Sequence, residues 1–250
     1  MTMLSARGQT INGVDAVIEF VEKDICRLAP AQQESKHYRL RNAGLENNGR
    51  NICFANAVIQ CMMHASELAI EFLPGSRTQH LNADSTSLAK QFSIAVTKMY
   101  SDTVMNPTAC YNLDNLKQAI DGHAKRFDDT DHHDAEEFLT AFLEFTHQEL
   151  NTGNGCETVV EHGDGNNSQL SADMMFGRLQ AQNSSIITDL FHGLSKSMTT
   201  CKECNFQSVK FDQFSNIQLS FEDSSKPVDL GKMLANYLAV ETLGQDYLIK

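Results

Sequence analysis

The chain has 250 residues, of which 41% are apolar and 21% are charged, and its formal net charge is −12. This composition is typical of a globular protein with one large domain or two small ones, and it excludes fibrous and intrinsically disordered proteins. A pI near 5.1 argues against a nucleic-acid partner, because binding to a phosphate backbone requires basic side chains.

The sequence also bears on compartment and on cysteine chemistry. No apolar run approaches the roughly 18 residues that a membrane span needs, and the first ten residues lack the apolar core of a signal peptide. We therefore expect a cytoplasmic or nuclear protein with no membrane partner. Seven Cys residues are an odd and modest number for this length, so we expect them to be catalytic, metal-bound or buried.

The first 150 residues have mainly helical patterns. Residues 13–29 have apolar residues at helical spacing, which predicts an amphipathic helix within an N-terminal extension of residues 1–41. From residue 42 onward the pattern predicts a helical subdomain of residues 42–150, with helices at about 51–73, 88–100, 113–120 and 131–150.

The remaining residues change in character. Residues 151–185 are rich in Gly, Asn and Ser and show no period, so we expect a flexible insertion. Residues 186–250 form the second subdomain, in which Ile217, Leu219 and Phe221 alternate with polar residues as in a half-buried strand. Helical spacing returns over 228–243. Helices followed by antiparallel strands predict an α+β fold.

One cysteine lies at a predicted helix start. In NNGRNICFANAVIQCMMH the apolar residues Ala55, Val58, Ile59, Met62 and Met63 share one helix face, and Cys53 falls on the opposite side. Asn51 is a favoured N-cap residue, which would place Cys53 in the first turn, where free amides stabilise a thiolate. From this segment alone, Cys53 is either a nucleophile or an inert buried cysteine.

The segment GLENNGRNICFANAVIQC resembles the cysteine box of the ubiquitin-specific proteases, which are papain-like deubiquitinases. The matching residues are Gly44, Leu45, Asn47, Gly49, Cys53, Phe54, Asn56, Ala57 and Gln60. Ile52 replaces the usual Thr, and one extra residue lies between the Gly-Leu pair and the Cys. The resemblance implies that Cys53 is the nucleophile. The oxyanion-hole Asn is Asn47 by alignment from Gly44 and Asn48 by counting back from Cys53.

A second segment belongs to the same resemblance. Residues 131–150 predict an amphipathic helix with an acidic first turn, and by periodicity alone this acidic end is a solvated surface. The sequence HHDAEEFL resembles the Gln-Gln-Asp-Ala-x-Glu-Phe-Leu box of the family, followed by an apolar helix that ends in His-x-Glu-Leu. The resemblance implies that Asp134 and Glu137 bind the arginine-bearing C-terminal tail of ubiquitin, which is sound chemistry for carboxylates.

Cys201 and Cys204 form a CxxC pair at the spacing of zinc ligands. Alone, such a pair is weak evidence, and a chance pair remains an alternative. The surrounding residues 190–221 resemble the fingers subdomain of the same family, with its Cys-x-x-Cys hairpin and a following Phe-x-x-Leu-Ser-Leu strand. The resemblance implies half of a structural zinc site, with Cys201 and Cys204 as two of the four ligands.

The resemblance implies a papain-like fold, with a helical thumb over 42–150 and β fingers over 186–250. The family's catalytic His comes from palm strands with a Gly-His-Tyr signature, which this sequence lacks. The implied function is a cysteine-type deubiquitinase that cleaves isopeptide or peptide bonds after the C-terminal Gly of ubiquitin, with ubiquitin and ubiquitinated proteins as partners and no cofactor for catalysis. The alternatives are a non-catalytic ubiquitin-binding adaptor and a zinc-dependent structural adaptor.

Overall fold

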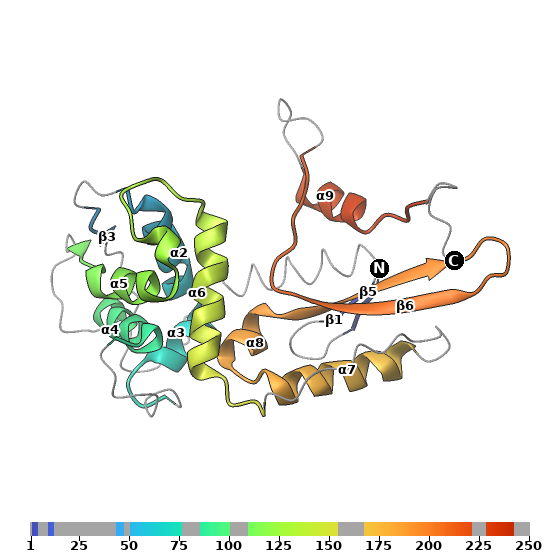
Figure 1. Ribbon diagram of the computed structural model, residues 1–250, viewed down its shortest axis with the longest axis horizontal. Helices are drawn as coiled ribbons and strands as arrows, with labels where there is room; N and C mark the ends of the chain where they lie inside the picture. The colour runs from blue at the N-terminus through green and yellow to red at the C-terminus, as the bar shows by residue number, and fades with distance from the viewer. Residues whose placement is uncertain are drawn as a thin grey trace. The chain divides into compact units, whose positions relative to one another are not determined.

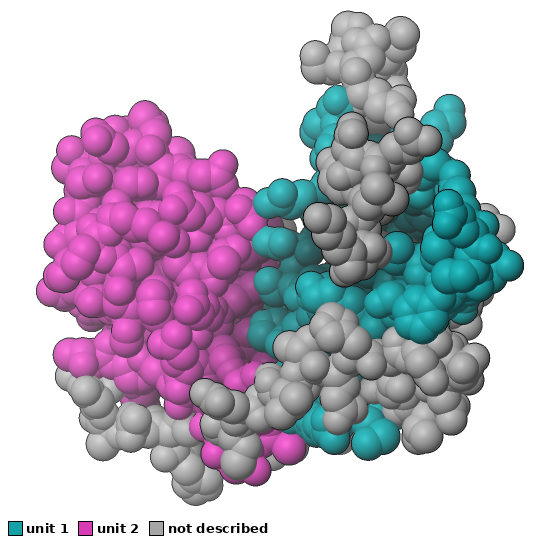
Figure 2. Space-filling model, turned by 45° about the vertical axis from the view of Figure 1, so that its right-hand side comes forward, with its two compact units in different colours: residues 1–26, 157–179, 191–250 teal, residues 27–156, 180–190 magenta. Residues whose placement is uncertain are grey.

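The computed structural model of the chain describes residues 2–4, 10–12, 44–47, 51–76, 86–100, 110–154, 168–221 and 229–242. The chain divides into two compact units, drawn in magenta and teal in Figure 2. The helical unit takes residues 27–156 and 180–190, and the sheet unit takes residues 1–26, 157–179 and 191–250. The predicted helix at 13–29 lies outside the described residues.

The helical unit is built around one long helix. In chain order its elements are α2 (Cys53–His64), α3 (Ser66–Phe72), α4 (Leu88–Tyr100), α5 (Asp114–His123), the 3-10 helix η2 (Lys125–Phe127) and α6 (Ala135–Leu150). Helix α6 contacts α2, α4 and α5, as Figure 1 shows. The apolar faces of these helices are buried against each other, which supplies most of the stability that short helices lack in isolation.

Aromatic side chains fill the centre of this unit. Phe92 lies edge-on to Phe72 at a ring-centroid distance of 4.8 Å and to Phe142 at 5.1 Å. Such edge-to-face pairs are favourable because the positive ring edge meets the negative ring face. The Tyr100 hydroxyl donates to the Met63 carbonyl over 2.8 Å, and burial raises the pKa of Tyr100. The hydrogen bond joins α4 to α2 within the core.

The sequence located these helices well and gave both ends of α4 correctly, but it misplaced ends of the other helices. The predicted helix at 51–73 is two helices, because Ala65 has extended backbone angles between α2 and α3. The predicted core face of α2 is correct, since Ala55, Val58, Ile59, Met62 and Met63 are all buried. Helix α6 begins at Ala135 rather than near 131, because the Asp134 side chain caps its first amides.

The helical unit also contains a short parallel strand pair that the sequence did not indicate. Strand β3 (Gly44–Leu45) pairs with β4 (Cys110–Tyr111), so Gly44 lies opposite Cys110. A Cβ on Gly44 would lie 3.1 Å from Cys110 Sγ, which explains why a residue without a side chain fits here. This pairing brings the residues just before α2 against a segment more than sixty positions later.

The sheet unit has a four-stranded antiparallel sheet in the order β2-β1-β5-β6. Its strands are β1 (Thr2–Leu4), β2 (Thr10–Asn12), β5 (Gly193–Thr200) and β6 (Gln207–Phe214). On one face, Leu194, Val209 and Phe211 are buried under α7 (Ser168–Gln182), whose Ala172, Met175 and Leu179 contact them. The predicted antiparallel strands of the second half are therefore confirmed, and strands from the N-terminal residues join the same sheet.

Two sequence predictions in this region are wrong. The expected flexible insertion at 151–185 contains helix α7, whose weak signal was the helical spacing of Ala172, Met175 and Leu179. The expected strand at Ile217–Phe221 is irregular, although Ile217 and Leu219 are still less exposed than their neighbours. No partner strand pairs with these residues in the described part of the chain, and an alternating pattern without a partner does not make a strand.

Two short helices complete the described residues. Helix α8 (Ile186–Phe191) precedes β5. Helix α9 (Leu230–Tyr237) lies within the predicted 228–243 segment and is capped by Asp229, whose side chain accepts from the Lys232 amide over 3.0 Å. Among the residues that the structure describes, no helix has the length and apolar character required to span a membrane.

Candidate active site

Cys53 is the first residue of α2, and its side chain is exposed while those of Phe54 and Ala55 are buried. The prediction that it lies in the first turn is confirmed. The prediction that Asn51 caps the helix is wrong, because Ile52 occupies the N-cap position and no side chain caps the helix. The side-chain amide of Asn51 instead donates to the Thr130 carbonyl over 2.8 Å. Cys53 therefore combines solvent access with the free amides of a helix start.

The segment before α2 is held by three hydrogen bonds at Glu46. The Glu46 amide donates to the Tyr111 carbonyl over 3.0 Å, extending the β3–β4 pairing. The Asn56 amide group donates to the Glu46 carbonyl over 3.0 Å, and the Asn112 amide group reaches a Glu46 carboxylate oxygen at 3.3 Å. Asn47 follows directly and is exposed, whereas Asn48 lies outside the described residues. Asn56 therefore ties the segment of the candidate oxyanion residue to the helix of Cys53.

The two predicted substrate-binding acids lie at the start of α6. Asp134 accepts hydrogen bonds from the amides of Glu136 at 2.7 Å and Glu137 at 3.2 Å, so it caps the helix. Glu137 forms an ion pair with Arg126, whose Nε lies 3.1 Å from Oε1, and both side chains are about half exposed, at 45% and 53%. The Arg126 guanidinium also lies 4.9 Å above the centre of the Phe127 ring. Glu137 thus pairs with a guanidinium within this chain.

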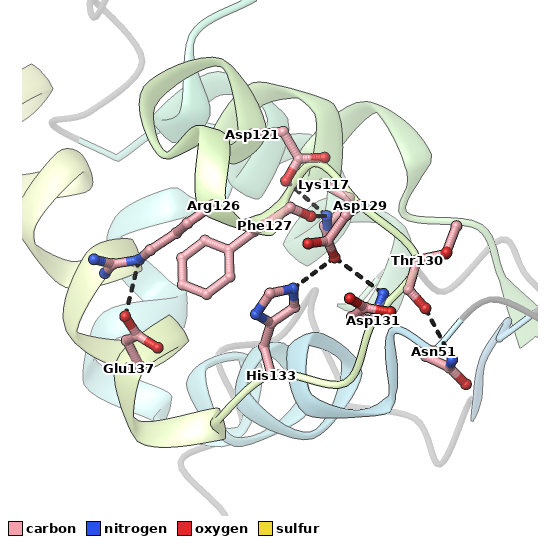
Figure 3. Close-up of polar contacts among 10 residues, drawn as sticks. All are labelled: Asn51, Lys117, Asp121, Arg126, Phe127, Asp129, Thr130, Asp131, His133 and Glu137. Atoms are coloured by element: carbon pink, nitrogen blue, oxygen red, sulfur yellow. Dashed lines mark hydrogen bonds and ion pairs between the residues drawn. The ribbon is translucent and has the colours of Figure 1, made fainter.

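A cluster of rings joins α2 to the start of α6. His133 meets Phe54 at a centroid distance of 5.2 Å and Phe127 at 5.3 Å, in both cases edge to face, and Phe138 closes the cluster from α6. His133 Nε2 lies 2.7 Å from Asp129 Oδ1, which also accepts from the Asp131 amide at 3.0 Å (Figure 3). These hydrogen bonds, from His133 first and then from the Asp131 amide, lower the pKa of Asp129.

A further ion pair fixes the other end of this loop. Lys117 Nζ lies 2.6 Å from Asp121 Oδ1 and donates to the Phe127 carbonyl over 2.6 Å. Burial raises the pKa of Asp121, and the hydrogen bond from Lys117 acts in the opposite direction. The contact holds the end of η2 against α5, as Figure 3 shows. The i, i+4 spacing of Lys117 and Asp121 is the local signal for this pair, but the predicted helix ended at residue 120, whereas α5 continues to His123.

Glu149, in the His-x-Glu-Leu end of the second motif, has a structural role. Its carboxylate accepts from the amides of Leu88 at 2.9 Å and Ala89 at 2.8 Å and from the Ser87 hydroxyl at 2.7 Å. His123 Nε2 lies 3.4 Å from the same group. A residue of α6 therefore caps the start of α4, where the free amides favour a negative charge.

A second histidine joins α6 to α8. His147 Nδ1 lies 2.7 Å from Ser185 Oγ, and that oxygen also accepts from the Thr188 amide over 3.3 Å. Burial lowers the pKa of His147, and a hydrogen bond with the Asn183 side chain acts in the opposite direction. His147 is therefore neutral at pH 7. Its partners form a helix cap, so we interpret the contact as structural.

The predicted metal ligands lie in the sheet unit, in the turn between β5 and β6. Cys201 and Cys204 are exposed. The Cys201 backbone amide donates to the Phe206 carbonyl, and the Cys201 carbonyl accepts from the Asn205 amide, both over 2.9 Å. Asn205 has a φ of 57°, which closes the turn. Hydrogen bonds from the Cys204 and Glu203 amides lower the pKa of Cys201. Among the described residues, no group of three or more potential ligands surrounds a metal position.

Solved structures define the fold class. The ubiquitin-aldehyde-bound Ubp8/Sgf11/Sus1/Sgf73 module matches with a TM-score of 0.58 at 16% identity, over 95% of this chain and 48% of that chain. The same module bound to monoubiquitin matches equally well. The fold is therefore the α+β, papain-like fold of the ubiquitin-specific proteases.

Sequence comparisons define the family. The family model for ubiquitin carboxyl-terminal hydrolase matches residues 43–221. The chain is 31% identical to ubiquitin carboxyl-terminal hydrolase Usp2 of Drosophila melanogaster over 183 residues, which is 73% of this chain and 19% of that protein. It is also 31% identical to human ubiquitin carboxyl-terminal hydrolase 32, over 70% of this chain and 11% of that protein. The chain belongs to the ubiquitin carboxyl-terminal hydrolase family of cysteine proteases, and it spans less than a fifth of the length of these two relatives.

Proposed function

We propose that this chain carries the nucleophile and part of the ubiquitin-binding surface of a deubiquitinase. The observation that carries the proposal is the exposed thiol of Cys53 at the first turn of α2, in a chain that belongs to a family of cysteine proteases. Cys53 attacks the carbonyl carbon of the bond that follows the C-terminal Gly of ubiquitin. The amine leaves, and water then hydrolyses the thioester.

The tetrahedral intermediate of this reaction carries an oxyanion that requires hydrogen-bond donors. We assign this role to the side-chain amide of Asn47 or Asn48. The tether from Asn56 to the Glu46 carbonyl supports the assignment, because it keeps this segment beside the helix of Cys53. The general base that must take the thiol proton is not assigned to any His of this chain.

The acidic start of α6 is the proposed site for the arginine side chains of the ubiquitin tail. The proposal is supported by the ion pair of Glu137 with Arg126, since the same carboxylate is 45% exposed and pairs with a guanidinium within this chain. Asp134 uses one carboxylate oxygen, Oδ1, for the helix cap and is exposed. Carboxylates bind guanidinium groups through strong, directional hydrogen bonds.

Cys201 and Cys204 are proposed as half of a structural zinc site. Two thiolates separated by two residues in a tight hairpin turn fit two corners of a tetrahedral zinc ion, and zinc would lock the tip of the β5–β6 hairpin. Two further ligands are required. Metal analysis of the purified chain and of Cys201→Ser tests the assignment, and an equal zinc content in both proteins would contradict it.

The second candidate is a non-catalytic adaptor that binds ubiquitin through the same acidic surface. The two candidates separate in one experiment with a ubiquitin that carries a thiol-reactive electrophile at its C-terminus, because labelling requires the nucleophile and does not require turnover. Labelling of the wild-type chain and not of Cys53→Ala would support the hydrolase. Binding of ubiquitin by both proteins without labelling would support the adaptor, and the absence of both binding and labelling would contradict both candidates.

A further inference from the structure

The loop between η2 and α6 contacts residues on both sides of Cys53. Before Cys53, the side-chain amide of Asn51 donates to the Thr130 carbonyl over 2.8 Å. After Cys53, the Phe54 ring meets the His133 ring at a centroid distance of 5.2 Å and an interplanar angle of 69°. The position of the thiol therefore depends on the conformation of residues 129–133.

One carboxylate determines that conformation. Asp129 Oδ1 lies 3.0 Å from the Asp131 amide nitrogen and 2.7 Å from His133 Nε2, so a single oxygen joins both halves of the loop (Figure 3). The bond to the Asp131 amide is the local turn that an Asp side chain typically makes two residues ahead. Because the carboxylate accepts, His133 Nε2 carries the proton in this contact.

His133 is held in place by its other neighbours as well. Its side chain is only 17% exposed, and it lies edge-on between Phe54 and Phe127. The orientation that presents Nε2 to Asp129 is the same one that places the ring against Phe54. A change at Asp129 therefore reaches the chain on both sides of Cys53, through Thr130 and Asn51 on one side and through His133 and Phe54 on the other.

We propose that Asp129 is a positioning residue for Cys53, which acts by holding the 129–133 loop against the start of α2. The same loop leads directly into the Asp134 cap, so Asp129 also sets where the acidic start of α6 lies relative to the thiol. This inference rests on the proposed function, since positioning matters only if Cys53 attacks a bound ubiquitin tail. Asp129 itself does not touch the reacting atoms.

The experiment measures the reaction of Cys53 with two reagents. One is ubiquitin with an electrophile in place of its C-terminal Gly, which must be aligned with the thiol. The other is chloroacetamide, which needs only an accessible thiolate. In Asp129→Ala we expect the rate with the ubiquitin reagent to fall about tenfold or more. The rate at Cys53 with chloroacetamide should stay within about twofold of wild type.

Two variants serve as controls. Asp129→Asn keeps an oxygen acceptor for the Asp131 amide and for His133, so it should retain most of the wild-type rate. Asp128→Ala removes a neighbouring exposed carboxylate, which lies 4.0 Å from the Lys125 ammonium, and should behave as wild type. Hydrogen exchange in the first two turns of α2 provides a readout without ubiquitin. It should be faster in Asp129→Ala and unchanged in Asp128→Ala.

Each outcome decides the proposal. Wild-type rates and wild-type exchange in Asp129→Ala would overturn it, as would an equal loss of rate with both reagents, which would indicate a less reactive or less accessible thiol. Faster hydrogen exchange throughout the helical unit, not only at α2, would indicate general unfolding and would also overturn it. If the wild-type chain reacts with chloroacetamide but not with the ubiquitin reagent, the proposed function fails. Hydrogen exchange at α2 then decides by itself whether Asp129 positions this helix.

Discussion

Helix α4 begins on a carboxylate from another helix, so Glu149→Ala should destabilise the helical unit. The substitution leaves the amides of Leu88 and Ala89 and the Ser87 hydroxyl without their partner. Hydrogen bonds to a charged group contribute about 1.5–3 kcal/mol each, and loss of an N-cap costs about 0.5–2 kcal/mol. The Glu149 side chain is only 17% exposed, so water replaces these contacts poorly.

Since such contributions are not additive, we expect the free energy of unfolding to fall by about 3 kcal/mol. The assay is urea unfolding, combined with hydrogen exchange of the α4 amides to locate the effect in the helical unit. Glu149→Gln keeps an oxygen acceptor and should lose about half as much. Glu144→Gln, at an exposed position of the same helix, should change stability by less than about 0.5 kcal/mol. A free energy of unfolding for Glu149→Ala within about 0.5 kcal/mol of wild type would contradict a stabilising role for this helix cap.

Two further predictions concern the junction of α6, α7 and α8. Gly153→Ala should lower the free energy of unfolding by about 1–3 kcal/mol in a urea titration, because the new Cβ would lie 1.9 Å from the Gln182 carbonyl oxygen. Gly122→Ala is the control, since Gly122 has open space around it and its substitution should not destabilise the chain. Because burial lowers the pKa of His147 below the unfolded value of 6.5, the unfolded chain binds more protons just below that pH. Stability should therefore fall as pH drops below 6.5. In urea titrations from about pH 5 to about pH 8, His147→Gln should reduce this dependence on pH, whereas His132→Gln, at an exposed position, should leave it unchanged.

Much of the helical unit could be predicted from the sequence because its elements are amphipathic. The spacing of Ala55, Val58 and Ile59 defined the buried face of α2 and, by exclusion, the exposed position of Cys53. The capping role of Asp134 could also have been read from its place before an acidic first turn. The sequence instead suggested Asn51 as the cap of α2. The side-chain amide of Asn51 donates instead to the Thr130 carbonyl, which lies 79 residues away in the sequence. No local pattern indicates such a contact.

The features that the sequence missed depend on long-range contacts. Strand β3 exists because Gly44 can lie against Cys110, and α4 is capped by Glu149, which lies 61 residues after Leu88. Helix α7 was not predicted because, among its described side chains, only three apolar residues, Ala172, Met175 and Leu179, contact the sheet, which leaves a weak helical pattern. The link from Asp129 to His133 had a weak local signal, an Asp two residues before another Asp in a loop, but its consequence for Cys53 appears only once Phe54 and His133 are brought together.

The covalent reaction of this chain with a ubiquitin that carries a C-terminal electrophile tests most directly whether Cys53 is the nucleophile. We expect one ubiquitin per chain, with the adduct at Cys53 by peptide mass spectrometry and no adduct in Cys53→Ala. Cys61 and Cys110 are also exposed and serve as internal controls for nonspecific thiol reaction. Labelling of Cys53 no faster than that of Cys61 and Cys110 would contradict the assignment of Cys53 as the nucleophile.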